Sequence, residues 1–99
     1  MRIEFADEEL RRLYVDPEFV LPQFGPDLIR AYRKKVGFLA SANSELDLRA
    51  YRALRYEKLR GDRQGQHSVR LNQQWRIVLR VETDDAGRLL IIIEIVDYH

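Results

Sequence analysis

Residues 75–96 read WRIVLRVETDDAGRLLIIIEIV, and this stretch decides the fold. From Trp75 to Glu82, apolar and polar side chains alternate with a period of two, which is typical of a strand with one buried face. Asp84-Asp85-Ala86-Gly87 supplies the residues of a hairpin connection. Leu89 to Val96 is almost wholly apolar, so we expect a central strand covered on both faces.

Two shorter strands are predicted before this hairpin, over residues 67–71 and 56–59, with a turn between them. The apolar face of residues 75–82 is expected to pack against the layer that covers the sheet. Trp75 lies on this face, so it is expected in the core rather than as a stacking platform for a nucleic-acid base. His67 shares a face with apolar neighbours and is expected to be semi-buried rather than catalytic. The opposite face would carry Arg70, Arg76 and Arg80.

Helices are predicted in the N-terminal half. Asp7 is a suitable cap for a helix that ends before Pro17. Pro26 suits the first position of a second helix, which carries one apolar stripe. A helical piece over residues 45–51 and a strand over residues 2–5 are also predicted. Helices followed by strands predict an α+β fold, with two N-terminal helices packed on one face of a mainly antiparallel twisted sheet.

Composition limits what this sequence can be. The length of 99 residues predicts a single domain over residues 1–99. There is no cysteine, which excludes disulfides and thiolate chemistry, and the two histidines lack ligand spacing, so we expect no metal and no cofactor. The start lacks the apolar core of a signal peptide, and the longest apolar run, residues 89–93, is too short to span a membrane. We therefore expect a cytoplasmic protein without membrane contact.

The net charge of +1 hides a strong asymmetry. Residues 49–80 carry nine Lys or Arg against two Asp or Glu, whereas the segments before and after carry an excess of acids. Eight of the nine cations are arginines, which suit bidentate contacts with phosphate. Two interpretations remain open at this point: a nucleic-acid or phosphate site, and a solvated surface balanced by acids elsewhere.

Two groups of side chains invite a functional hypothesis. Asp97-Tyr98-His99 follows the last strand with three groups that exchange protons, although polar residues also end many strands and terminal residues fray. Tyr51 and Tyr56 are interleaved with arginines, so that they either stack on bases or close the edge of the core.

Residues 59–77, LRGDRQGQHSVRLNQQWRI, together with the final Asp97-Tyr98-His99, carry a combination of motifs. It resembles the HigB-type toxins of the RelE superfamily, which typically show Leu-Lys-Gly, a Gly-Asp/Asn-Arg-x-Gly turn, Ser-Val/Ile-Arg, Asn-x-x-Trp-Arg-Ile and a closing Asp/Glu-Asp-Tyr-His. The resemblance covers about residues 45–99 well and implies a RelE-like fold.

The resemblance also implies an activity and partners. It implies a ribosome-dependent mRNA interferase that cuts mRNA in the ribosomal A site without a metal, by attack of the 2′-hydroxyl on the adjacent phosphate. The implied partners are a cognate helix-turn-helix, HigA-like antitoxin, the ribosome and mRNA. Operator DNA would be contacted only indirectly, through the antitoxin.

Carried over by position, the resemblance implies five catalytic residues: Arg60, Arg76, Asp97, Tyr98 and His99. His99 or Asp97 would be the base, Arg76 the transition-state stabiliser, Arg60 a phosphate clamp, and Tyr98 a stacking platform or proton relay. The RNA-binding residues expected around them are Lys58, Arg63, Arg70 and Arg80.

Two positions depart from the family pattern. Glu57-Lys58 stands where other members have His-Pro, so Glu57 either replaces that histidine or forms an ion pair with Arg60 or Lys58; we expect the ion pair. Arg60 replaces a lysine and cannot readily donate a proton. A non-catalytic RNA- or protein-binding domain of the same fold is the alternative function.

Overall fold

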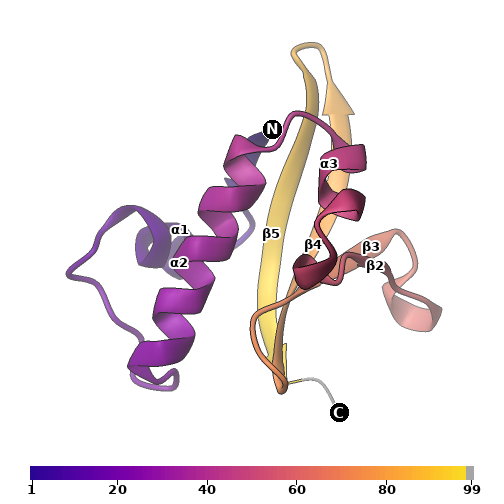
Figure 1. Cartoon of the computed structure of the whole chain (residues 1–99). Helices are drawn as coiled ribbons and strands as arrows, with labels where there is room; N and C mark the ends of the chain where they lie inside the picture. Colours follow the sequence, from indigo (N-terminus) through magenta and orange to yellow (C-terminus); the bar gives the residue numbers. More distant parts are fainter. Residues whose placement is uncertain (98–99) are drawn as a thin grey trace.

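The computed structural model describes residues 1–97 and has the α+β architecture predicted from the sequence (Figure 1). Its elements in chain order are β1 (Arg2–Phe5), α1 (Glu8–Val15), α2 (Pro26–Ser41), α3 (Glu45–Ala50), the 3₁₀ turn η1 (Arg52–Leu54), β2 (Glu57–Lys58), the 3₁₀ turn η2 (Gly61–Arg63), β3 (Gln66–Arg70), β4 (Trp75–Asp84) and β5 (Gly87–Asp97).

The strands form one sheet in the order β1-β5-β4-β3-β2. All neighbours are antiparallel except β1, which pairs with β5 in parallel, so the prediction of a mainly antiparallel sheet is confirmed. The β4–β5 hairpin turns at Gly87, whose φ of 113° is accessible to glycine at little cost. The register shifts once, between Val78 and Leu79, where β5 has one extra residue.

Both predicted N-terminal helices begin at the residues that the sequence indicated. The Asp7 side chain accepts a hydrogen bond from the Glu9 backbone N–H at 2.8 Å, which caps α1, and Pro26 opens α2. The connection between the helices is held by Arg33, whose guanidinium donates to the carbonyl oxygens of Leu13 at 2.8 Å and Phe19 at 2.7 Å. Arg33 therefore fixes this connection.

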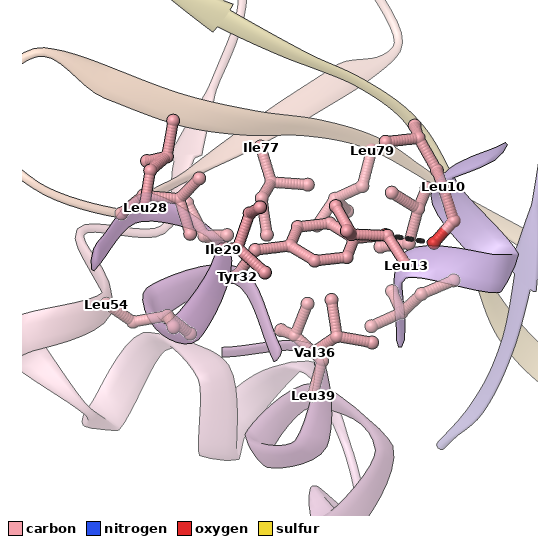
Figure 2. Close-up of a cluster of buried hydrophobic side chains, with 14 of the residues drawn as sticks. Leu10, Leu13, Leu28, Ile29, Tyr32, Val36, Leu39, Leu54, Ile77 and Leu79 are labelled. Carbon is pink, nitrogen blue, oxygen red and sulfur yellow. Dashed lines mark hydrogen bonds between the residues drawn. The ribbon is translucent and has the colours of Figure 1, made fainter. Parts of the chain in front are cut away.

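The core lies between these helices and one face of the sheet. Tyr32 of α2 is fully buried among leucines of α1 and the β4 residues Ile77 and Leu79, and its hydroxyl donates to the Leu10 carbonyl at 2.8 Å (Figure 2). Trp75 packs edge-on against Phe24, with ring centroids 5.7 Å apart, on this same face. The alternation in β4 therefore places Arg76, Val78 and Arg80 on the face away from the helices, as predicted.

The expectation that residues 89–96 are covered on both faces holds only at Leu89. The helices cover only one face, where Leu90 and Ile92 join the core. On the other face, Leu89 is buried, but Ile91 and Val96 are only partly buried. An apolar run does not distinguish a strand covered twice from a strand whose second face borders an open site.

Candidate active site

Arg76 is the central cation on the face of the sheet away from the helices, which we call the open face. It lies in the middle of the sheet, opposite Arg70 of β3 and Val96 of β5 in the strand register, and is only 6% exposed. Its Nη2 donates to the Arg55 carbonyl at 2.5 Å, and its Nη1 lies 3.9 Å from Glu57 Oε1. A buried guanidinium held in this way keeps a fixed direction, which is what bidentate binding of an anion such as phosphate requires.

The Arg55 carbonyl reaches Arg76 because of an uncommon backbone conformation. Arg55 has φ 50° and ψ 50°, in the left-handed region, and no other non-glycine residue among residues 1–97 has a positive φ. Such a conformation costs free energy in a residue with a side chain, and it often marks a functional site. Here it turns the chain out of η1 and presents a carbonyl oxygen to the guanidinium.

Two pockets of about 400 Å³ each meet at Arg76. We call the first the arginine pocket; it is lined by Arg55, Glu57, Arg70, Asn72, Gln73 and Arg76. We call the second the Asp97 pocket; it is lined by Leu59, Arg63, Ser68, Arg76, Val78, Val96 and Asp97. Arg76 thus lines both pockets despite its small exposed area.

Four of the predicted site residues line these pockets. Asp97 and Arg63 lie in the pocket that takes its name from Asp97, Arg70 lies in the arginine pocket, and Arg76 belongs to both. Asp97 Oδ2 accepts a hydrogen bond from Gln74 Nε2 at 2.9 Å. Arg63 forms an ion pair with Glu94 and donates to Gln66 Oε1 at 3.1 Å.

Three other predicted residues lie outside both pockets. Arg60 is exposed, directly before η2. Arg80 lies four residues along β4 from Arg76, about 13 Å at strand spacing, and forms an ion pair with Glu82 at 2.5 Å. In the strand register Lys58 lies opposite His67, and His67 lies opposite the core residue Leu79. Lys58 therefore lies on the helix side of the sheet. Tyr98 and His99 lie outside the described residues.

The expected ion pair of Glu57 with Arg60 or Lys58 is wrong, because the carboxylate of Glu57 pairs with Arg76 instead. The reason is the register: Glu57 lies opposite Ser68 on the open face, one residue out of phase with Lys58. Ser68 was also missed. Its hydroxyl oxygen is buried in the Asp97 pocket and makes no hydrogen bond within residues 1–97. The alternation of β3 could have indicated it, since Ser68 lies two residues from Arg70.

His67 is semi-buried, as predicted, and lines neither pocket. Its ring stacks on Tyr56 with centroids 4.7 Å apart and an interplanar angle of 3°. Burial, and then the nearby charges of Arg49 and Lys58, lower the pKa of His67 below its usual range. This histidine is therefore held neutral as part of the packing behind the sheet edge.

Residues 1–97 hold no group of three or more His, Cys, Asp or Glu side chains that are placed to bind a metal ion. Nor does any helix in this part of the chain combine the length and the apolar character needed to cross a membrane.

Residues 3–99 match a family described as the RelE-like toxin of the type II toxin–antitoxin system HigB. The chain belongs to this HigB family. Toxin HigB-1 of Vibrio cholerae serotype O1 is 32% identical to it over 82 residues, which span 81% of this chain and 83% of that protein. The family match confirms the resemblance stated from the motifs, and it extends over the N-terminal half that those motifs did not cover.

Solved structures show how widely the fold of this HigB-family toxin is shared. The YoeB/ParE toxin from Agrobacterium tumefaciens superposes with a TM-score of 0.56 at 16% identity, covering 100% of both chains. The toxin–antitoxin complex RelBE2 from Mycobacterium tuberculosis gives a TM-score of 0.52 at 20% identity, covering 98% of this chain and 96% of that one. At these identities the shared property is the fold.

Proposed function

We propose that this HigB-family toxin is an endoribonuclease that cleaves translated mRNA in the ribosomal A site by attack of the 2′-hydroxyl on the adjacent phosphate. One observation carries the proposal: the buried cation Arg76 stands between two open pockets, with the carboxylate residue Asp97 lining one of them. A fixed guanidinium beside a carboxylate supplies the charge stabilisation and the proton acceptor that this reaction needs.

In the proposed reaction, Asp97 or His99 takes the proton from the 2′-hydroxyl. The O2′–P bond forms, the P–O5′ bond breaks, and the leaving 5′-oxygen gains a proton, which leaves a 2′,3′-cyclic phosphate and a 5′-hydroxyl. Arg76 stabilises the additional negative charge on the pentacovalent phosphate. Arg60 would hold a neighbouring phosphate, and Tyr98 would stack on a base or relay a proton. No step requires a metal ion.

The proposed RNA contacts divide according to their positions. Arg63 and Arg70 line the pockets and would bind phosphates next to the one that is cut. Lys58 and Arg80 lie outside the pockets, so their contribution would be long-range attraction of RNA or contact with ribosomal RNA.

The proposed partners follow from the family. The solved relatives include a toxin–antitoxin complex, which supports a cognate antitoxin for this chain. We propose that this antitoxin is a helix-turn-helix, HigA-like protein through which operator DNA is contacted, and that the toxin acts on ribosomes in the cytoplasm.

The test is incubation of the purified protein with ribosomes that carry a defined mRNA. We expect a cut in the A site whose products end in a 2′,3′-cyclic phosphate and a 5′-hydroxyl. Replacing the attacking 2′-hydroxyl with hydrogen should abolish the cut. Cleavage that continues at the deoxy position would refute the 2′-hydroxyl mechanism.

One observation favours the alternative of a non-catalytic RNA- or protein-binding domain: Glu57 places a negative charge 3.9 Å from Arg76, where a substrate phosphate would bind. The same assay separates the two functions, because a binding domain would associate with ribosomes and leave the mRNA intact.

A further inference from the structure

A third pocket, of about 370 Å³, lies beside the arginine pocket, where α3 and η1 lead into the sheet. It is lined by Arg49, Tyr51, Arg52, Arg55 and Tyr56. Arg55 also lines the arginine pocket, so the two adjoin. We call it the tyrosine pocket. The reaction proposed above places no substrate group in it.

The cations of the tyrosine pocket are incompletely neutralised. Arg49 lies 3.6 Å from Glu45, but Arg52 and Arg55 have no carboxylate within 4.0 Å among residues 1–97. Six other arginines on the surface form ion pairs, whereas Arg60 and Arg70 have no carboxylate within 4.0 Å among residues 1–97; the six are Arg2, Arg11, Arg12, Arg30, Arg80 and Arg88. Two adjacent arginines without such partners form a local positive field that attracts phosphate.

The two tyrosines of the pocket differ in their environment. Tyr56 is immobilised: its ring stacks on His67 and its hydroxyl donates to Glu45 at 3.1 Å. It therefore closes the edge of the core, which was one of the two alternatives left open by the sequence. Tyr51 is 41% exposed, with its ring 4.6 Å from that of Phe38. Lys35 Nζ also lies over this ring, 5.6 Å from its centroid, so a base that stacks on Tyr51 would displace this flexible side chain.

We propose that the tyrosine pocket binds one nucleotide of single-stranded RNA, with the base stacked on Tyr51 and the flanking phosphate held by Arg52 and Arg55. An aromatic face beside unpaired guanidiniums matches a ligand that carries a base and a phosphate together. Because Arg55 belongs to both pockets, this nucleotide continues the strand that runs past Arg76. The inference rests on the proposed function and extends it to a nucleotide away from the cleaved bond.

The test is fluorescence anisotropy with a 2′-O-methyl oligoribonucleotide, which binds without being cleaved. Tyr51→Ala should weaken binding by at least about fivefold, which corresponds to the loss of one base–aromatic stack. Arg52→Ala should weaken binding and reduce the slope of log K against log salt by about 0.7, the value for one phosphate contact with a single strand. Tyr51→Phe keeps the ring and should bind like the wild type.

Arg30→Ala is the matched charge control, because Arg30 is paired with Asp27 on the exposed surface of α2. If Tyr51→Ala and Arg52→Ala both bind like this control in affinity and salt slope, the pocket assignment is wrong. The absence of binding by the wild type would overturn it equally. A wild type that binds through these residues but never cuts mRNA would refute the proposed function and leave the pocket standing.

The nucleotide can come from the mRNA or from ribosomal RNA. A photo-crosslinking amino acid at position 51, used on programmed ribosomes, distinguishes the two sources. Crosslinks to the mRNA beside the A-site codon are expected from strand continuity with the arginine pocket. Crosslinks confined to ribosomal RNA would overturn that continuity.

Discussion

The Glu57→Gln variant tests what the ion pair between Glu57 and Arg76 does. Glu57 Oε1 lies 3.9 Å from Arg76 Nη1. At about that separation, two unit charges interact with about 1 kcal/mol in water and about 4 kcal/mol at an effective dielectric constant of 20. The Glu57 side chain is 47% exposed, so the lower value applies, and the pair contributes about 1 kcal/mol.

A phosphate that binds Arg76 must compete with this carboxylate. Removing the charge of Glu57 should therefore strengthen binding of the 2′-O-methyl RNA about fivefold, the factor that corresponds to roughly 1 kcal/mol. The midpoint of thermal unfolding should fall by no more than about 4–8 °C. Anisotropy titrations measure the first effect and a thermal scan the second. Glu8→Gln is the charge-matched control, because Glu8 pairs with Arg11 on the exposed surface of α1, and neither residue is a proposed RNA contact.

Two results would refute this reasoning. An RNA affinity equal to that of Glu8→Gln would show that Glu57 does not compete with phosphate. A cleavage rate lower by about 10²- to 10⁴-fold with RNA binding retained is the effect of losing a general base, and it would assign the proton transfer to Glu57.

Three further predictions concern Asp97, Tyr32 and His67. Asp97→Asn should lower the single-turnover cleavage rate by about 10²- to 10⁴-fold while RNA affinity is retained, and a loss below tenfold would place the base elsewhere. Tyr32→Phe removes the buried hydrogen bond to the Leu10 carbonyl and should lower the free energy of unfolding in urea by about 0.5–1.5 kcal/mol; an unchanged midpoint would contradict this. Because the pKa of His67 is lowered in the folded state, the unfolded chain binds that proton first, and the stability due to neutral His67 is lost as pH falls through and below 6.5. His67→Phe keeps a ring on Tyr56 and should flatten the pH dependence of the melting temperature between about pH 8 and about pH 5, whereas an equally steep dependence would refute this.

The sequence predicted those elements whose signals are local. Asp7 and Pro26 marked the starts of the two helices, and the alternation of β4 placed Arg76 on the open face. The parallel pairing of β1 had no such signal, because four residues near the end of a chain do not indicate which edge they join. Fold class and helix packing were predictable because burial periodicity determines both.

The site was only partly predictable, because its contacts depend on register. A shift of one residue in β2 would exchange the faces of Glu57 and Lys58. A strand of two residues has no sequence pattern that predicts its register with β3. The left-handed conformation of Arg55 was equally hidden, since the usual indicators of that conformation are glycine and asparagine. Motif resemblance supplied Arg63, Arg76 and Asp97, which line the Asp97 pocket, but not the ion pair of Glu57 with Arg76.

The single-turnover rate of mRNA cleavage on programmed ribosomes, with and without the Arg76 guanidinium, tests the proposed chemistry most directly. Arg76→Ala should lower this rate by about 10²- to 10³-fold, the loss seen when one donor to a transition-state oxyanion is removed. Arg76→Lys, which keeps the charge without the planar fork, should fall between Arg76→Ala and the wild type, and Arg30→Ala should match the wild type. A thermal scan confirms that each variant is folded. A folded Arg76→Ala protein that cuts mRNA at the wild-type rate would contradict the central role of Arg76.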